Sequence, residues 1–103
     1  MVAMLHTVNK SPFENNTLDS CLRLARAGSA VLLIEDGVYA ALKGTALSDR
    51  VTKAMQQLSI FVLGPDAQAR GLEPSRLLDG IRIVDYGGFV DLVAEHPRVQ
   101  SWL

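Results

Sequence analysis

The chain consists of short apolar runs that end abruptly in turn-forming or capping residues. Four of these runs, residues 2–8, 30–35, 59–63 and 81–84, are long enough for a strand and are apolar almost throughout. Strands that are buried on both faces read in this continuous way, whereas strands with one wet face alternate. The pattern therefore predicts four strands of a mainly parallel sheet.

Helical segments are expected between these runs. The predicted segments are 16–27, 38–42, 48–58, 64–71 and 89–95. Asn16 or Thr17 can cap the first segment, and Ser48 can cap the third. Gly28 can end the first segment in a left-handed conformation. Pro97 is expected to stop the last segment.

Strands that alternate with helices predict a three-layer α/β/α domain with a mainly parallel central sheet. Right-handed crossovers then place helices on both faces. A length of 103 residues indicates one domain spanning 1–103. The strand order stays open at this stage. The apolar tail 99–103 either packs against its own sheet or anchors an interface through Trp102.

The composition excludes several classes of function. A formal net charge of -1 disfavours direct binding to nucleic acid. The single cysteine excludes an intrachain disulfide and fits a reducing compartment. No run approaches the roughly 18 apolar residues of a membrane span, and no signal peptide is recognisable. We therefore expect a cytoplasmic protein without membrane contact. The hydrophobic content of 49% fits a buried parallel sheet or a subunit that hides further surface against partners.

Polar residues follow the predicted strands, where open α/β sheets usually bind ligands. They are Asn9, Lys10, Asp36, Asp66 and Asp85. A magnesium or phosphoryl-transfer site is conceivable, but capping and turn roles are favoured for these aspartates. The pair Gly87-Gly88 lacks the spacing of a dinucleotide or P-loop motif. We therefore predict no metal and no cofactor.

Cys21 is the candidate catalytic residue, since it is the only thiol that could carry sulfur as a persulfide. It shares an apolar helix stripe with Leu18, Leu22 and Ala25, and a cysteine on such a stripe is usually a small core residue. A position early in a helix can lower a thiol pKa, and basic residues follow on the same helix. Packing is the favoured role, and sulfur chemistry is the alternative.

Two histidines and one cysteine fall short of a standard zinc set unless partners contribute ligands. His6 lies in or at the end of the first predicted strand, and a hydrogen-bonded structural role is expected for it. His96 precedes Pro97 and is expected to be exposed at a helix end.

A series of short motifs covers nearly the whole chain. They are Leu5-His6-Thr7, Ser11-Pro12-Phe13, Glu35-Asp36-Gly37-Val38, Val62-Leu63-Gly64-Pro65-Asp66, Ala69-Arg70-Gly71, Val84-Asp85-Tyr86, Phe89-Val90 and Gln100-Ser101-Trp102-Leu103. In this order they resemble the small sulfur-relay subunits DsrH and TusB. Asn9-Lys10 and Cys21 look more like DsrH than TusB.

This resemblance implies a DsrE-like fold and a cytoplasmic heterohexamer built from two copies each of three related chains. The implied partners are DsrE- and DsrF-like, or TusD- and TusC-like, subunits. Such complexes relay sulfane sulfur as cysteine persulfide to a DsrC- or TusE-like acceptor. The principal sulfur-carrying cysteine belongs to the DsrE or TusD chain, so this subunit need not be catalytic.

Three functions follow as hypotheses. The first is a subunit of a sulfurtransferase complex in sulfur oxidation, as the likeness to DsrH implies. The second is a TusB-type subunit that acts in 2-thiolation of the tRNA wobble uridine. The third is a stand-alone α/β module that binds a ligand through Lys10, Asp36, Asp66 and Asp85.

Overall fold

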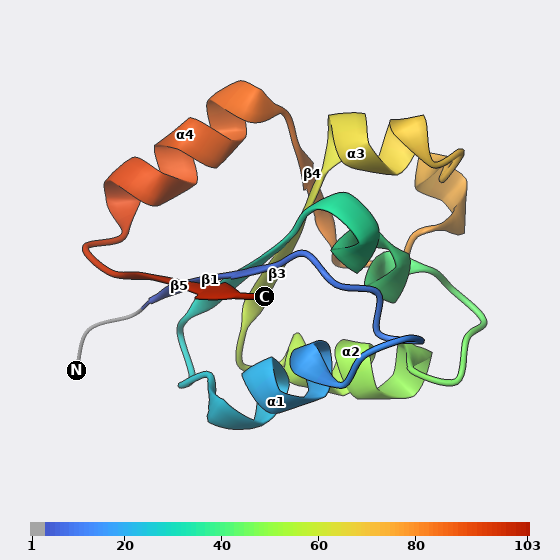
Figure 1. Ribbon diagram of the computed structural model, residues 1–103, viewed down its shortest axis with the longest axis horizontal. Helices are drawn as coiled ribbons and strands as arrows, with labels where there is room; N and C mark the ends of the chain where they lie inside the picture. The colour runs from blue at the N-terminus through green and yellow to red at the C-terminus, as the bar shows by residue number, and fades with distance from the viewer. Residues whose placement is uncertain (1–3) are drawn as a thin grey trace.

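A five-stranded parallel sheet forms the centre of the protein. The computed structural model describes residues 4–103, so the start of the predicted first strand (residues 2–3) lies outside the described residues. The strands are β1 Leu5–Val8, β2 Ala30–Leu33, β3 Ser59–Leu63, β4 Arg82–Val84 and β5 Val99–Trp102. Their order across the sheet is β4-β3-β2-β1-β5, and every neighbouring pair is parallel (Figure 1).

Six helical segments connect the strands. They are α1 Thr17–Leu24, η1 Glu35–Ala41, α2 Ser48–Ala54, α3 Gly64–Ala69, η2 Pro74–Arg76 and α4 Tyr86–Glu95, of which η1 and η2 are 3₁₀ helices. Figure 1 shows α4 on one side of the sheet and α1 and α2 on the opposite side. The predicted α/β fold with helices on both faces is confirmed.

The strand order explains this unequal distribution. From β1 to β4 the chain adds each new strand on the same side of the previous one, and it then returns across the sheet to place β5 beside β1. A right-handed crossover puts its helix on one face when the chain advances and on the other face when it reverses. The reversal falls between β4 and β5, so α4 alone covers its face.

Two separate core clusters reflect the two faces. Side chains alternate along each strand, so Val31 and Leu33 of β2 enter the cluster shared with α1, η1, α2 and α3, while Ala30 and Leu32 enter the cluster beneath α4. The first cluster is much the larger. Leu92 is the buried residue that α4 contributes to the second cluster. The core therefore lies mainly on the face opposite α4.

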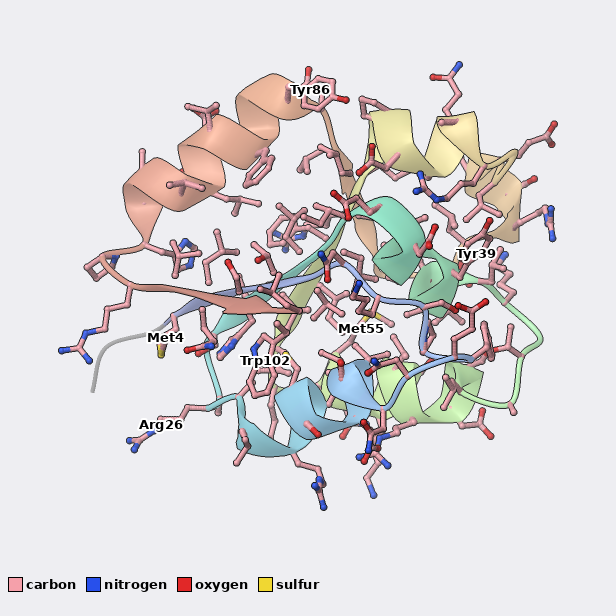
Figure 2. All side chains as sticks on the ribbon, in the orientation of Figure 1. Met4, Arg26, Tyr39, Met55, Tyr86 and Trp102 are labelled. Carbon is pink, nitrogen blue, oxygen red and sulfur yellow. The ribbon has the colours of Figure 1, made fainter. Side chains whose placement is uncertain are left out.

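The C-terminal tail forms a fifth strand, which the sequence analysis left undefined. β5 pairs with β1 in the register Leu5↔Val99 to Val8↔Trp102. Trp102 packs against the larger core cluster, between β5 and α1 in Figure 2. Of the two predicted roles for the tail, packing against its own sheet is therefore the observed one.

Several predicted helix boundaries were wrong. α1 ends at Leu24 rather than near residue 27, because Ala25 is extended, although Gly28 is left-handed as expected at φ 88°. Its first turn is held by the Asn15 carboxamide, which accepts the Thr17 N–H at 2.8 Å, so neither Asn16 nor Thr17 is the side-chain cap. α4 begins at Tyr86, three residues earlier than predicted, because Asp85 caps it.

The segment after β2 also differs from the prediction. The strand ends at Leu33, and residues Glu35–Ala41 form a 3₁₀ helix in place of the short helix predicted over 38–42. A close approach explains why the chain turns here: a Cβ on Gly37 would lie 2.9 Å from the carbonyl carbon of Val8. Only glycine allows η1 to pack directly on the end of β1.

The second half of the chain shows smaller differences. The helix predicted over 48–58 ends at Ala54, and residues 55–57 form turns before β3. Ser48 is not its cap: the Ser48 hydroxyl donates to the Leu42 carbonyl and accepts the Thr45 N–H. The helix predicted over 64–71 ends at Ala69.

Candidate functional site

Cys21 lies within the larger core cluster and has no exposed surface. It occupies the inner face of α1 together with Leu18, as the i, i+3 spacing predicted. Burial raises the pKa of the Cys21 thiol to about 12. Removal from water disfavours the charged thiolate, and this effect outweighs any lowering by the helix dipole.

The basic residues near Cys21 do not activate it. Arg23 points to the surface and forms an i, i+4 ion pair with Asp19 at 3.7 Å. Arg26 extends away from the body of the protein (Figure 2). Cys21 therefore lacks both the exposure and the neighbouring positive charge that characterise reactive thiols.

His6 is a buried, hydrogen-bonded residue, as expected. The Trp102 indole N–H donates to Nδ1 of His6 at 3.0 Å. A nitrogen that accepts a hydrogen bond carries no proton, so this contact fixes the neutral tautomer with its hydrogen on Nε2. Burial lowers the pKa of His6 from its ordinary value. The pair joins β1 to β5, and the neighbouring hydroxyls of Thr7 and Ser101 add a second link at 3.3 Å.

The three aspartates at the carboxyl ends of the strands have structural partners. Asp85 accepts the Gly88 N–H at 2.8 Å and caps α4, as predicted. Asp66 accepts the N–H of Glu35 at 2.7 Å, which ties α3 to a residue with the unusual φ of 50°. Asp36 forms an ion pair with Arg70 at 3.0 Å. The predicted capping role is therefore confirmed for Asp85, whereas Asp36 and Asp66 cap neither η1 nor α3 and instead link these two segments.

The described residues contain no group of three or more His, Cys, Asp or Glu side chains that could hold a metal ion. Lys10 is exposed after β1. His96 is half-buried rather than exposed, and its Nδ1 donates to the Leu92 carbonyl at 2.7 Å. The two histidines thus belong to separate hydrogen bonds at different places in the fold.

Asn9 stands out at the edge where β1 ends. Its side-chain oxygen is buried and accepts no hydrogen bond from any of residues 4–103. A buried acceptor without a donor typically costs about 1–3 kcal/mol. Because the sheet reverses beside β1, Asn9 lies where open α/β sheets bind their ligands.

The outer side of α4 carries an exposed apolar stripe. Tyr86, Val90 and Val93 recur at i, i+4 and i+7, so they share one side of the helix. Tyr86 is 60% exposed and Val90 66% exposed, and Figure 2 shows Tyr86 pointing away from the protein. This surface was not predicted from the sequence, although the helical spacing of its three residues is visible there.

A family described as "DsrH like protein" matches residues 10–99. Proteins named TusB from Pectobacterium parmentieri and Escherichia coli K12 are 37% and 34% identical to this chain. Each alignment covers 96% of this chain and all of the relative.

The chain belongs to the DsrH/TusB family. The resemblance read from the short motifs is thereby confirmed over the full length. Because members of this family are sulfur-relay subunits, the prediction that this chain is a sulfur-relay subunit is confirmed as well.

Solved structures confirm the fold. The YchN protein of E. coli superimposes with a TM-score of 0.83 over 98% of this chain and 99% of that protein, at 18% identity. The protein MTH1491 from Methanobacterium thermoautotrophicum superimposes with a TM-score of 0.74 over 96% of both chains, also at 18% identity. At this identity the likeness concerns the fold alone.

Residues 4–103 include no helix that is long and apolar enough to cross a membrane. This finding agrees with the short lengths of all the helices in the described part of the chain, of which α4 with 10 residues is the longest.

The His6–Trp102 contact predicts a pH dependence. Because burial lowers the folded-state pKa of His6 below 6.5, the unfolded chain binds the proton more readily. The contribution of neutral His6 to the free energy of unfolding is fully present above pH 6.5, and it is lost as the pH falls through the folded-state pKa. Urea unfolding across this range measures it. A His6→Gln variant should lose this part of the slope, and an unchanged slope would contradict the assignment.

Proposed function

We propose that this chain is a docking subunit, without the principal sulfur-carrying thiol, of a cytoplasmic heterohexameric sulfurtransferase complex. Its partners in this proposal are chains related to DsrE and DsrF, or to TusD and TusC. The observation that carries the proposal is the apolar stripe on α4, defined by Tyr86, Val90 and Val93.

The stripe is unusual for an isolated protein. A surface helix normally turns its apolar side to the core and its polar side to water. α4 has Leu92 as its one buried residue, and its stripe faces solvent. Contiguous exposed apolar residues of this kind mark interaction sites. A tyrosine flanked by aliphatic residues also fits the composition of interface cores.

The state of Cys21 supports a role outside the main sulfur pathway. Persulfide transfer requires a thiolate that a partner thiol can approach. Burial raises the pKa of the Cys21 thiol to about 12, so this thiol is neutral at pH 7. The thiol also has no exposed surface. We therefore assign Cys21 to packing and the sulfur-carrying cysteine to a partner chain.

For the pathway we propose the TusB type, in which sulfur passes to a TusE-like acceptor and serves 2-thiolation of the tRNA wobble uridine. The relatives named TusB support this choice, among them the Erwinia tasmaniensis protein with 39% identity. Sulfur oxidation with a DsrC-like acceptor is the second candidate. The specific features that favour it are Asn9-Lys10 and Cys21, which look more like DsrH.

The pathway can be tested in cells. The gene, expressed with the two related chains of its own organism in an E. coli strain lacking TusB, should restore 2-thiouridine in tRNA. Mass spectrometry of digested tRNA measures the modified nucleoside. Restoration supports the TusB-type function. A complex that assembles in these cells but restores none would favour sulfur oxidation.

The docking role predicts that Val90→Glu blocks assembly with the partner chains while the subunit stays folded. Val90 is 66% exposed, so the charge meets water in the free chain but must lose its hydration in an interface. The matched control is Leu24→Glu, because Leu24 is 68% exposed on α1, across the sheet. Size-exclusion chromatography with light scattering compares the two. Assembly of the Val90→Glu chain as complete as that of the control would contradict the stripe as an interface.

The packing role of Cys21 predicts that Cys21→Ser costs roughly 1–3 kcal/mol of unfolding free energy, because a hydroxyl enters an apolar site. Sulfur transfer by the reassembled complex should persist. Urea denaturation gives the stability, and a transfer assay with the loaded complex gives the activity. A Cys21→Ser complex that is stable and fully assembled yet unable to pass sulfur would place Cys21 on the pathway.

A further inference from the structure

The outer edge of β4 is an open strand edge. β4 is the first strand in the sheet order and pairs with β3 alone, from Phe61↔Arg82 to Leu63↔Val84. Natural proteins usually protect such an edge with charged residues, proline or a covering segment. Ile83, at the centre of β4, is instead 48% exposed.

The one charged residue of β4 does not guard this side. The guanidinium of Arg82 lies over the ring of Phe61, 5.7 Å from its centroid. Phe61 packs against the cluster beneath α4. Because neighbouring side chains of a strand point to opposite faces, Ile83 lies on the other face from Arg82. The edge is therefore apolar on the side away from α4.

An apolar groove of about 1040 Å³ lies beside β4 and extends from α3 and η2 to the start of α4 at Asp85 and Gly88. Its apolar walls come from α3, η2 with its flanking residues, and β4: Ala67, Leu72, Pro74, Leu77, Ile83 and Val84. At one end of the groove Ile83 packs closely against the backbone of Gly64, because a Cβ on Gly64 would lie 3.0 Å from Cγ2 of Ile83. This end lies at the start of α3.

The groove is negatively charged. Two of the residues that line it carry a charge, Glu73 and Asp85, and both are acidic. An occupant with a basic side chain would therefore be attracted, whereas an acidic occupant would be repelled. The open edge favours a partner segment with an extended backbone, because an added strand can form hydrogen bonds with the outer N–H and C=O groups of β4.

We propose that the β4 edge and this groove bind an extended apolar segment that carries a lysine or arginine and belongs to a partner subunit. This inference rests on the proposed function and deepens it, because it gives the chemistry of the partner segment. The segment adds a sixth strand to the sheet, an apolar side chain contacts Ile83, and the basic side chain lies near Glu73. β4 has three residues, so most of the affinity comes from the groove.

The test uses the full chain with each related partner chain, with dissociation constants from titration calorimetry. Ile83→Asp should weaken binding by about tenfold or more, as expected for a central interface residue. Ile83→Val should retain it. Leu24→Asp, on α1, is the control. Glu73→Gln, at an exposed position, should raise the dissociation constant at low salt and make it less dependent on the salt concentration. Circular dichroism shows whether each variant is folded.

Hydrogen exchange in the wild-type complex provides the second readout. The amides of β4 should gain protection on binding. This inference is wrong if the Ile83→Asp chain binds its partner as tightly as the wild-type chain does and the β4 amides gain no protection in the wild-type complex. The proposed function stands in that case. If the effect of Glu73→Gln is absent, the assignment of a basic segment is wrong. If the wild-type chain binds no related chain, both proposals are overturned.

Discussion

The reversal of the chain between β4 and β5 determines which helices cover each face of the sheet and which strand lies beside β1. Because crossovers are right-handed, one reversal leaves the other five helical segments on one face of the sheet and α4 alone on the opposite face. A single ten-residue helix with one buried leucine gives thin cover to a five-stranded sheet. The same reversal brings the C-terminal strand beside β1, where Trp102 reaches His6. One topological constraint thus produces both the best-packed and the least-covered parts of the protein.

The two faces have different consequences for chemistry. On the well-covered face Cys21 is sealed in the core, and burial holds its thiol neutral. On the thin face the apolar stripe of Tyr86, Val90 and Val93 remains at the surface. A sulfur-relay subunit with its thiol inside and its apolar residues outside is organised for contact with other chains. This organisation fits the proposed function, in which a related subunit carries the principal cysteine.

The sequence predicted the fold well, because parallel strands buried on both faces leave continuous apolar runs. β3 was predicted with its observed bounds, and Asp85 capped its helix as expected. The fifth strand was missed because Val99–Trp102 mixes polar and apolar residues at an edge, and such a pattern acquires meaning only once β1 is its neighbour. The stripe on α4 and the groove beside β4 depend on which face each helix covers. Strand order decides this, and strand order lies beyond local sequence patterns.

The central claim is that sulfur travels through a partner chain while this subunit supplies docking surface. The most direct test is the intact mass of each chain after the reassembled complex is loaded with a sulfur donor under non-reducing conditions. We expect the mass of an additional sulfur atom on a cysteine of a partner chain and an unmodified mass for this chain. Additional sulfur on Cys21, appearing before or together with that on the partner and lost when the acceptor is added, would contradict it.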